Sequence, residues 1–290
     1  MAQDNVRGII WMLVAMLAFA FGDTFLKLLA GAVAAGQLLI LTGIGGALIF
    51  GVLAWRAGAT NWLVNFVHPG VFARTCCEGL AATGFILAFA SAPLSIIAAI
   101  MQTNPLIVTL GAALLLKERV GPRRWGAIAL GLLGMMIVIR PWGEAFEPTA
   151  LYALVGTVFL SARDLLTRFV PDGVPTVQLG VYAMAFLLPT GAVVQVIMGS
   201  SWTSLDASQS WILLGSIAMI PLGFFGATQS MRLGEVSAVA PFRYARLIFA
   251  LILAAIVFGE RPDLWTYLGA SIVVCSGLYA MWRERVVQKA

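Results

Sequence analysis

The sequence predicts an all-α polytopic membrane protein with ten transmembrane helices, arranged as two inverted repeats of five helices each. Three observations support this fold class. Hydrophobic residues make up 61% of the 290 residues and charged residues only 11%, less than half of the roughly 25% that is usual in soluble proteins. Apolar runs of about 20 residues, the length that crosses a bilayer, recur along the chain. The two halves of the sequence also resemble each other.

Ten apolar segments are separated by short connections that contain turn-forming residues. Short connections favour antiparallel neighbours. The first segment contains Asp23 and Lys27, and its pattern recurs later in the chain, so we expect a retained helix rather than a cleaved signal peptide. The expected spans are residues 7–29, 36–56, 70–90, 94–116, 122–140, 149–169, 176–198, 210–231, 236–258 and 264–283.

The internal repeat is clearest in its charged residues and glycines, because chance matches between apolar residues are common. One alignment pairs Asp23 with Asp164, and a second pairs Glu118 with Glu260. The aligned segments are 11–27 with 152–168, and 114–134 with 255–277. An odd number of spans in each repeat inverts the second copy in the membrane, which is the plan of many secondary transporters.

The predicted repeats cover residues 1–143 and 144–290. With an even number of spans, both termini lie on one side of the membrane. Twelve Lys and Arg residues are expected on that side, against three on the other: Lys27, Arg140 and Arg261. Because positive residues accumulate in cytoplasmic loops, we expect both termini to face the cytoplasm.

Several charged side chains fall within the expected spans. The cations are Arg163, Arg243 and Arg246, and the anions are Asp23, Glu78 and Asp164. Guanidinium groups stay charged in proteins, and intramembrane ionisable residues usually face the bundle interior or a wet cavity. An ion pair in partly hydrated protein is worth roughly 4 kcal/mol at 4 Å, comparable with an insertion cost of about 2.5–3.5 kcal/mol. We therefore expect a paired, hydrated cluster whose carboxylates are candidates for carrying coupling protons.

A purely structural role for these charges is the alternative, in which they only hold helices in register. It applies most directly to Glu78, which lies four residues after Arg74 and is expected to pair with it on one helix face.

The fourth helix of each repeat carries polar residues beside a proline. At the offset fixed by the repeat, Gln102 corresponds to Tyr244 and Asn104 to Arg246. Proline removes a backbone donor and can kink or unwind a helix, and discontinuous helices with polar midplane groups mark transporter substrate sites. Arg243 and Arg246 are expected to share one face, since they are three residues apart. The residues expected to line a central substrate cavity are Gln102, Asn104, Arg243, Tyr244 and Arg246.

The sequence predicts no cofactor, no metal site and no catalytic residue. Cys76, Cys77 and Cys275 lack metal-ligand spacing, and no phosphate-binding loop for ATP is present. A membrane-embedded enzyme is a remote alternative, because the single histidine, His68, has no partner motif. A channel would need pore-lining rings from several subunits. The net charge of +5 reports membrane orientation rather than nucleic-acid binding.

These residues together resemble the EamA branch of the drug/metabolite transporter superfamily, over nearly the whole chain. The similarity is carried by "KER" and "GER", which precede "RRWGAIALGLLG" and "LWTYLGASIVV". Within that branch, "FGDTFLK", "ARDLLTRF" and "APFRYARL" are similar to a subset that includes bacterial S-adenosylmethionine and riboflavin uptake transporters.

This resemblance implies a secondary active transporter that moves a nucleoside-like or flavin-like metabolite across the bacterial inner membrane by alternating access. Its implied partners are the small-molecule substrate and the lipid bilayer, with the chain acting as a monomer or a homodimer. Arg246 stands where related sequences often differ, which leaves the cargo open. Export of amino acids or drug-like metabolites is the alternative function.

Overall fold

The computed structural model describes residues 4–117, 121–141 and 148–288. Within these ranges the chain is helical apart from turns and connections, and no strand occurs in them. Ten helical segments are long and apolar enough to cross a membrane. The predicted all-α class with ten spans is confirmed.

The helices follow the predicted order in both halves of the chain. The first half contains α1 (Asn5–Ala30), α2 (Ala35–Arg56), the short α3 (Trp62–Val67), α4 (Pro69–Ser91), α5 (Leu94–Met101), α6 (Asn104–Leu115) and α7 (Pro122–Ile139). The second half contains α8 (Ala150–Leu166), the 3-10 turn η1 (Thr167–Phe169), α9 (Thr176–Ile197), α10 (Ala207–Leu233), α11 (Val236–Val239), the 3-10 turn η2 (Ala240–Tyr244), α12 (Ala245–Phe258) and α13 (Leu264–Gln288). The predicted repeat boundary after residue 143 lies outside the described residues and stays a prediction.

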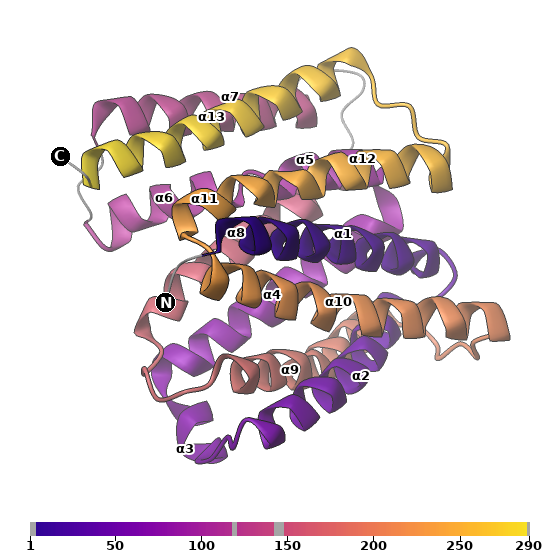
Figure 1. The fold of residues 1–290 in the computed structure, drawn as a ribbon. Coiled ribbons are helices and arrows are strands. Elements are labelled where there is room, and N and C mark those ends of the chain that lie inside the picture. The colour runs from indigo at the N-terminus through magenta and orange to yellow at the C-terminus, as the bar shows by residue number, and fades with distance from the viewer. Residues whose placement is uncertain (1–3, 118–120, 142–147, 289–290) are drawn as a thin grey trace.

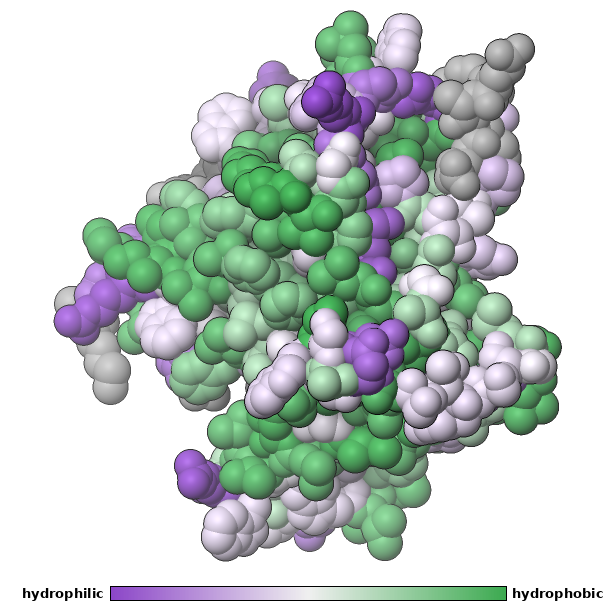
Figure 2. Space-filling model, turned by 90° about the vertical axis from the view of Figure 1, so that its right-hand side faces the viewer, coloured by the Kyte–Doolittle hydropathy of each residue, from purple (hydrophilic) through white to green (hydrophobic). Residues whose placement is uncertain are grey.

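The two ends of the bundle are named by the chain termini. α1 begins and α13 ends at the same end (Figure 1), here called the termini side; the other end is the opposite side. Figure 2 views the opposite side, which is mostly apolar or weakly polar, with strongly hydrophilic residues at scattered points. Large apolar side chains are exposed along the spans, including Leu48, Val52, Ile248 and Ile256. Such a surface belongs in lipid, and the chain is a multi-pass membrane protein.

Each main helix pair joins the two halves of the chain. α1 packs against α10 and α8 against α4, while α2 packs against α9 and α7 against α13 (Figure 1). Glycines on both partners allow the helices of a pair to approach closely, as between α7 and α13. A Cβ on Gly134 would lie 2.9 Å from the Gly269 carbonyl oxygen, and a Cβ on Gly269 would lie 2.6 Å from the Gly134 oxygen. This reciprocity is what two inverted repeats produce about a shared axis, and small residues let membrane helices approach closely.

The short helix α3 differs from the expected plain connection between the second and third spans. Its apolar residues are held by aromatic contacts: Trp62 and Phe66 both pack on the ring of Tyr182, at centroid distances of 6.0 and 5.3 Å. Pro69, at the first position of α4, starts a separate helix directly after it. The connection is therefore a structured segment on the termini side.

Both predicted breaks in the fourth helices are present. Gln102 and Thr103 form a turn between α5 and α6, and Pro105 is the second residue of α6. In the second half, Pro241 lies within the 3-10 turn η2, between α11 and α12. The backbone is irregular at equivalent positions, and the polar side chains of the fourth helices are carried there.

Candidate functional site

A buried ion pair links α1 to α12 beside the second break. The Nε and Nη2 atoms of Arg246 donate to Oδ2 of Asp23 at 3.1 and 2.7 Å. The guanidinium carbon lies 5.1 Å from the centroid of the Phe19 ring. The side chains of Arg246 and Asp23 are only 21% and 15% exposed. The charge of Arg246 is therefore compensated inside the bundle by one carboxylate and one aromatic face.

The other half of the chain contains the equivalent contact. Asn104 Nδ2 donates to Oδ2 of Asp164 at 3.0 Å, and Ser161 Oγ donates to Asn104 Oδ1 at 2.6 Å. The sequence repeat matches Asp164 with Asp23 and Asn104 with Arg246. In both halves, an aspartate on the first helix meets the residue that follows the break in the other half's fourth helix. The charged contact of one half is an amide contact in the other.

A second ionic cluster joins α4 to α8. Arg163 Nε lies 3.2 Å from Glu78 Oε2 and 3.3 Å from Asp164 Oδ1. Arg74 Nη2 lies 3.9 Å from the same Glu78 oxygen, and Arg74 Nε donates to Thr167 Oγ1 at 3.0 Å. The expected contact between Arg74 and Glu78 is present, but Glu78 also reaches across to Arg163. Two guanidiniums and two carboxylates balance in charge here.

The two helix breaks touch each other. Gln102 Nε2 donates to the backbone carbonyl oxygen of Tyr244 at 3.1 Å, and these two positions are equivalent in the repeat. Tyr244 is 5% exposed, and its hydroxyl has no hydrogen-bond partner among the described residues. The hydroxyl occupies space left by Gly277 on α13, where a Cβ would lie 1.7 Å from it. A buried hydroxyl without a hydrogen-bond partner is energetically costly, so Tyr244 is an unusual residue at the contact between the two helix breaks.

Arg243 and Arg246 lie in different surroundings. Arg246 is paired with Asp23, whereas Arg243 is exposed, and no ion pair to it is recorded among the described residues. The expected shared face of the two arginines stays a prediction. Arg243 belongs to the 3-10 turn η2 and Arg246 to α12, which begins at Ala245, and the two side chains differ in exposure and in partners although they are only three residues apart.

A carboxylate on the opposite side binds the first turn of α5. Glu260 Oε1 accepts from the backbone N–H of Leu94 at 2.7 Å, and Oε2 accepts from the N–H and the hydroxyl of Ser95 at 3.0 and 2.8 Å. Lys27 Nζ lies 3.8 Å from Glu260 Oε1 and donates to the carbonyl oxygen of Ala92. These residues are here called the opposite-side latch. It ties the end of α12 and the end of α1 to the start of α5.

Sequence reasoning missed the latch, because it treated Glu260 only as part of a repeated turn. A usable signal was present. The first N–H groups of a helix need acceptors, and α5, which starts after Pro93, has no side-chain cap of its own. The negative charge of Glu260 also suits the positive end of the helix dipole.

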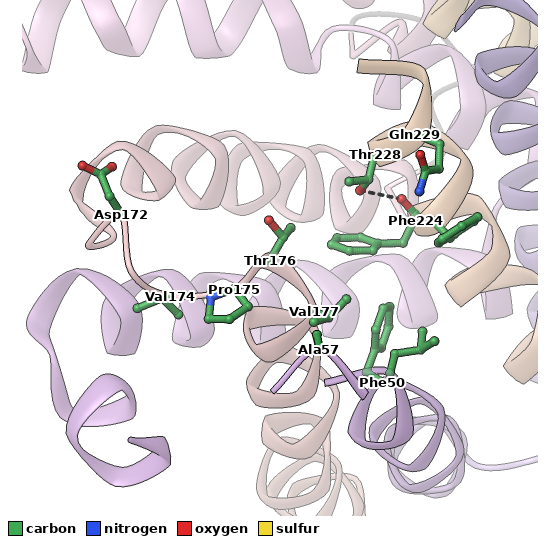
Figure 3. A pocket seen from close by; sticks show the side chains of 12 residues that line it. Phe50, Ala57, Asp172, Val174, Pro175, Thr176, Val177, Phe224, Thr228 and Gln229 are labelled. Atoms are coloured by element: carbon green, nitrogen blue, oxygen red, sulfur yellow. Dashed lines mark hydrogen bonds between the residues drawn. The ribbon is translucent and has the colours of Figure 1, made fainter. Parts of the chain in front are cut away.

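A pocket with a volume of about 370 Å³ lies on the termini side, between the end of α2, the start of α9 and the second half of α10 (Figure 3). We call it the termini-side pocket. Its lining includes Phe50, Asp172, Pro175, Phe224, Thr228 and Gln229. None of the five predicted substrate-binding residues lines this pocket. In the part of the chain that the structure describes, no group of three or more His, Cys, Asp or Glu residues could hold a metal ion.

Comparison with known proteins gives a match over both halves of the chain. The profile of the EamA-like transporter family matches residues 6–140 and again residues 148–282. A solved crystal structure superposes with a TM-score of 0.58 over 98% of this chain and 96% of that chain, at 21% sequence identity. At this identity the structural match supports the fold alone.

Curated relatives carry names of uptake proteins. A riboflavin transporter of Vibrio cholerae is 28% identical over 179 residues, which cover 61% of this chain but only 59% of the relative's length. A riboflavin transporter of Rhizobium johnstonii is 25% identical over 211 residues, covering 73% of this chain and 69% of the relative. An S-adenosylmethionine uptake transporter of Rickettsia prowazekii is 23% identical over 296 residues, covering 98% and 95%.

Proposed function

Because the chain belongs to the EamA-like transporter family, we propose that it carries a nucleoside-like or flavin-like metabolite into a bacterial cell by alternating access. The family and the names of the relatives support a small-metabolite transporter rather than an enzyme. Riboflavin and S-adenosylmethionine, the cargoes in those names, define the class: a planar heterocycle with polar substituents. The bias of Lys and Arg towards the termini side supports an inner-membrane protein with cytoplasmic termini.

The observation that carries this proposal is the pair of equivalent contacts at the two helix breaks. Asp23 meets Arg246 in one half, and Asp164 meets Asn104 in the other. Inverted repeats that place polar groups on broken helices build their substrate sites at such a level of the membrane. A guanidinium has five N–H donors, and the contact with Asp23 uses only those on Nε and Nη2. The remaining donors suit carbonyl or carboxylate oxygens of a cargo.

Alternating access is supported by the difference between the two ends. On the opposite side the latch joins Glu260 to Leu94 and Ser95. On the termini side the chain forms the pocket beside Phe50 and Phe224. A carrier closed on one side and hollowed on the other has the arrangement expected of one of its two access states.

Proton coupling through Asp23 follows from the same geometry. A cargo that draws Arg246 away leaves the Asp23 carboxylate buried without its partner. Burial without a countercharge favours the neutral, protonated acid, so cargo binding and proton uptake would occur together. Glu78 is less suited to this role, because Arg163 and Arg74 both lie within 4 Å of it.

The test is uptake of labelled riboflavin, S-adenosylmethionine and aromatic amino acids by a transport-deficient host that expresses the chain. We expect uptake of at least one of the first two, and a loss of at least about tenfold in Arg246→Ala, because removing one partner of a buried pair costs about 3–5 kcal/mol. Arg243→Ala is also expected to reduce uptake. Arg56→Ala, which removes an exposed arginine at the end of α2, is the matched control and should transport normally.

The double variant Asp23→Asn/Arg246→Gln distinguishes a loss of transport from a loss of folding. It removes both charges together and leaves two side chains that can still hydrogen-bond, so we expect normal membrane expression with greatly reduced uptake. Wild-type uptake limited to amino acids would contradict the cargo class. Full transport by both Arg243→Ala and Arg246→Ala would contradict the assignment of the site.

A further inference from the structure

We propose that the termini-side pocket is a second cargo site, at which an uncharged or cationic planar heterocycle binds on its way between Arg246 and the termini side. This inference rests on the proposed transport function. It concerns a different set of residues, contributed by α2, α10, the start of α9 and the segment before it.

The pocket has the size and the aromatic lining that a planar ligand requires. Its volume of about 370 Å³ falls within the range of roughly 300–1,000 Å³ that is usual for small-molecule sites. Phe50 and Phe224 meet edge to face, with ring centroids 5.1 Å apart and planes at 86°. Phe50 is only 2% exposed, so its ring is fixed by the surrounding helices. Phe224, which is half-buried and held against this fixed ring, offers a rigid surface for stacking a heterocycle at little entropic cost.

The polar lining selects for hydrogen-bonding groups and against negative charge. Figure 3 shows Thr228 and Gln229 on α10 at one end of the pocket and Asp172 at the other. No hydrogen bond of the Gln229 side chain is recorded among the described residues, so its amide can both donate and accept. Among the side chains that the structure describes, Asp172 is the one ionisable group in the lining of the pocket. This carboxylate would repel the negative charge of a phosphate on the ligand, whereas a neutral or cationic ligand would not be repelled.

The pocket is connected to the central ion pair through one aromatic ring. Arg246 lies over the ring of Phe19, and the same ring lies against Gly223 on α10, the residue before Phe224; a Cβ on Gly223 would approach it to 2.7 Å. Ile220 on α10 lies against Gly22, next to Asp23. Phe224 follows Ile220 by four residues, a rise of about 6 Å along a helix. The pocket thus begins about one helical turn from the central site, on the way to the termini side.

A local thiol reporter tests the pocket directly. In the full chain carrying Thr228→Cys, the alkylation rate at position 228 by N-ethylmaleimide is measured by peptide mass spectrometry, with and without riboflavin. The hydroxyl of Thr228 only donates to the Phe224 carbonyl of its own helix, so the substitution is mild. We expect protection of about fivefold at four times the dissociation constant. Labelling of the native Cys275, on α13, should not change.

Flavin mononucleotide is the matched probe, because it adds a phosphate to the same ring system. We expect it to protect position 228 less than about twofold at the same concentration, and Asp172→Asn to raise this protection towards that of riboflavin. Phe224→Ala should abolish protection by riboflavin. Phe72→Ala, an exposed phenylalanine on α4 outside the pocket, is the control and should leave protection unchanged.

Uptake of labelled riboflavin and S-adenosylmethionine by the same Thr228→Cys protein separates the two proposals. Protection that depends on Phe224 supports the pocket site, whether or not uptake is seen. Uptake without protection overturns the pocket site and leaves the proposed function standing. Protection without uptake of either compound overturns the proposed function alone, and absence of both overturns both.

Discussion

Replacing Glu260 with glutamine is expected to open the opposite side of the bundle. The carboxylate uses both oxygens on α5: Oε1 accepts from the Leu94 N–H, and Oε2 accepts from the Ser95 N–H and hydroxyl. An amide has a single acceptor oxygen, so its NH₂ group must face one of these backbone donors. Lys27, 3.8 Å from Oε1, loses its countercharge at the same time.

The size of the effect follows from the hydrogen bonds that are lost. A hydrogen bond to a charged group contributes about 1.5–3 kcal/mol, and each 1.4 kcal/mol corresponds to a factor of ten in an equilibrium constant. Losing one such bond therefore shifts the balance between the closed and open opposite side by about ten- to hundredfold. If the open form makes up about 1% of wild-type molecules, a typical minor state, it rises to roughly 10–50% in Glu260→Gln.

The assay measures access of a water-soluble thiol reagent to a cysteine introduced by Ala92→Cys, a position within the latch that is only 1% exposed. We expect labelling to become at least about tenfold faster when Glu260→Gln is added. Asp263→Asn is the matched control. It removes a carboxylate from the same connection, but Asp263 binds Arg140 and Thr266 rather than α5. Equal labelling in the Glu260→Gln and Asp263→Asn proteins would refute the latch as the closure of this side.

Two further outcomes concern stability. Gly277→Ala should lower the unfolding temperature and impair transport, because its Cβ would overlap the Tyr244 hydroxyl and overpacking costs about 1–3 kcal/mol. Adding Tyr244→Phe should partly restore the unfolding temperature. Gly126→Ala is the control and should leave it unchanged, because a Cβ there would meet nothing within 4 Å. The hydrogen bond from Arg140 lowers the pKa of Asp263 from 3.8 to about 2. A folded-state pKa below the unfolded value means stabilisation that is complete above the unfolded pKa and lost as pH falls through the folded pKa. The difference in unfolding temperature between wild type and Asp263→Asn should therefore be constant between about pH 5 and 8 and shrink below about pH 4; a difference that already shrinks near neutral pH would exclude this cause.

The spans and the breaks were accessible from sequence because they depend on local chemistry. Long apolar runs define the ten helices, and Pro105 and Pro241 mark the two interruptions. The resemblance to the EamA branch also rested on local motifs, and the family match confirms it. The start of α10 was placed three residues too late, at residue 210 instead of Ala207. The capping box of Asp206 and Gln209 extends this helix into polar sequence.

The pairing of charges was not accessible in the same way. The sequence predicted that the charged residues within the spans compensate one another, but not that Asp23 pairs with Arg246. These two residues are 223 positions apart and meet only because α1 packs on α12. The contact of Glu260 with Ser95, across 165 positions, depends equally on how the ends of α12 and α5 meet. The different surroundings of Arg243 and Arg246 depend on how η2 and α12 pack against α1, which sequence spacing alone does not specify.

The contacts at the two equivalent positions differ in where the positive charge is placed. If the repeats of an inverted-repeat carrier were identical in sequence, its two access states would be related by a two-fold rotation and would have equal energy. Here Asp23 is paired with the guanidinium of Arg246, whereas Asp164 accepts from the amide of Asn104 and lies 3.3 Å from Nε of Arg163, its neighbour on α8. Both contacts use a carboxylate, but of the two only the contact of Asp23 is an ion pair between a first helix and the other half's fourth helix. We infer that this difference in side chains, rather than the shared fold, biases the empty carrier towards one of its two sides, and that a cargo which engages Arg246 weakens that bias by competing with Asp23.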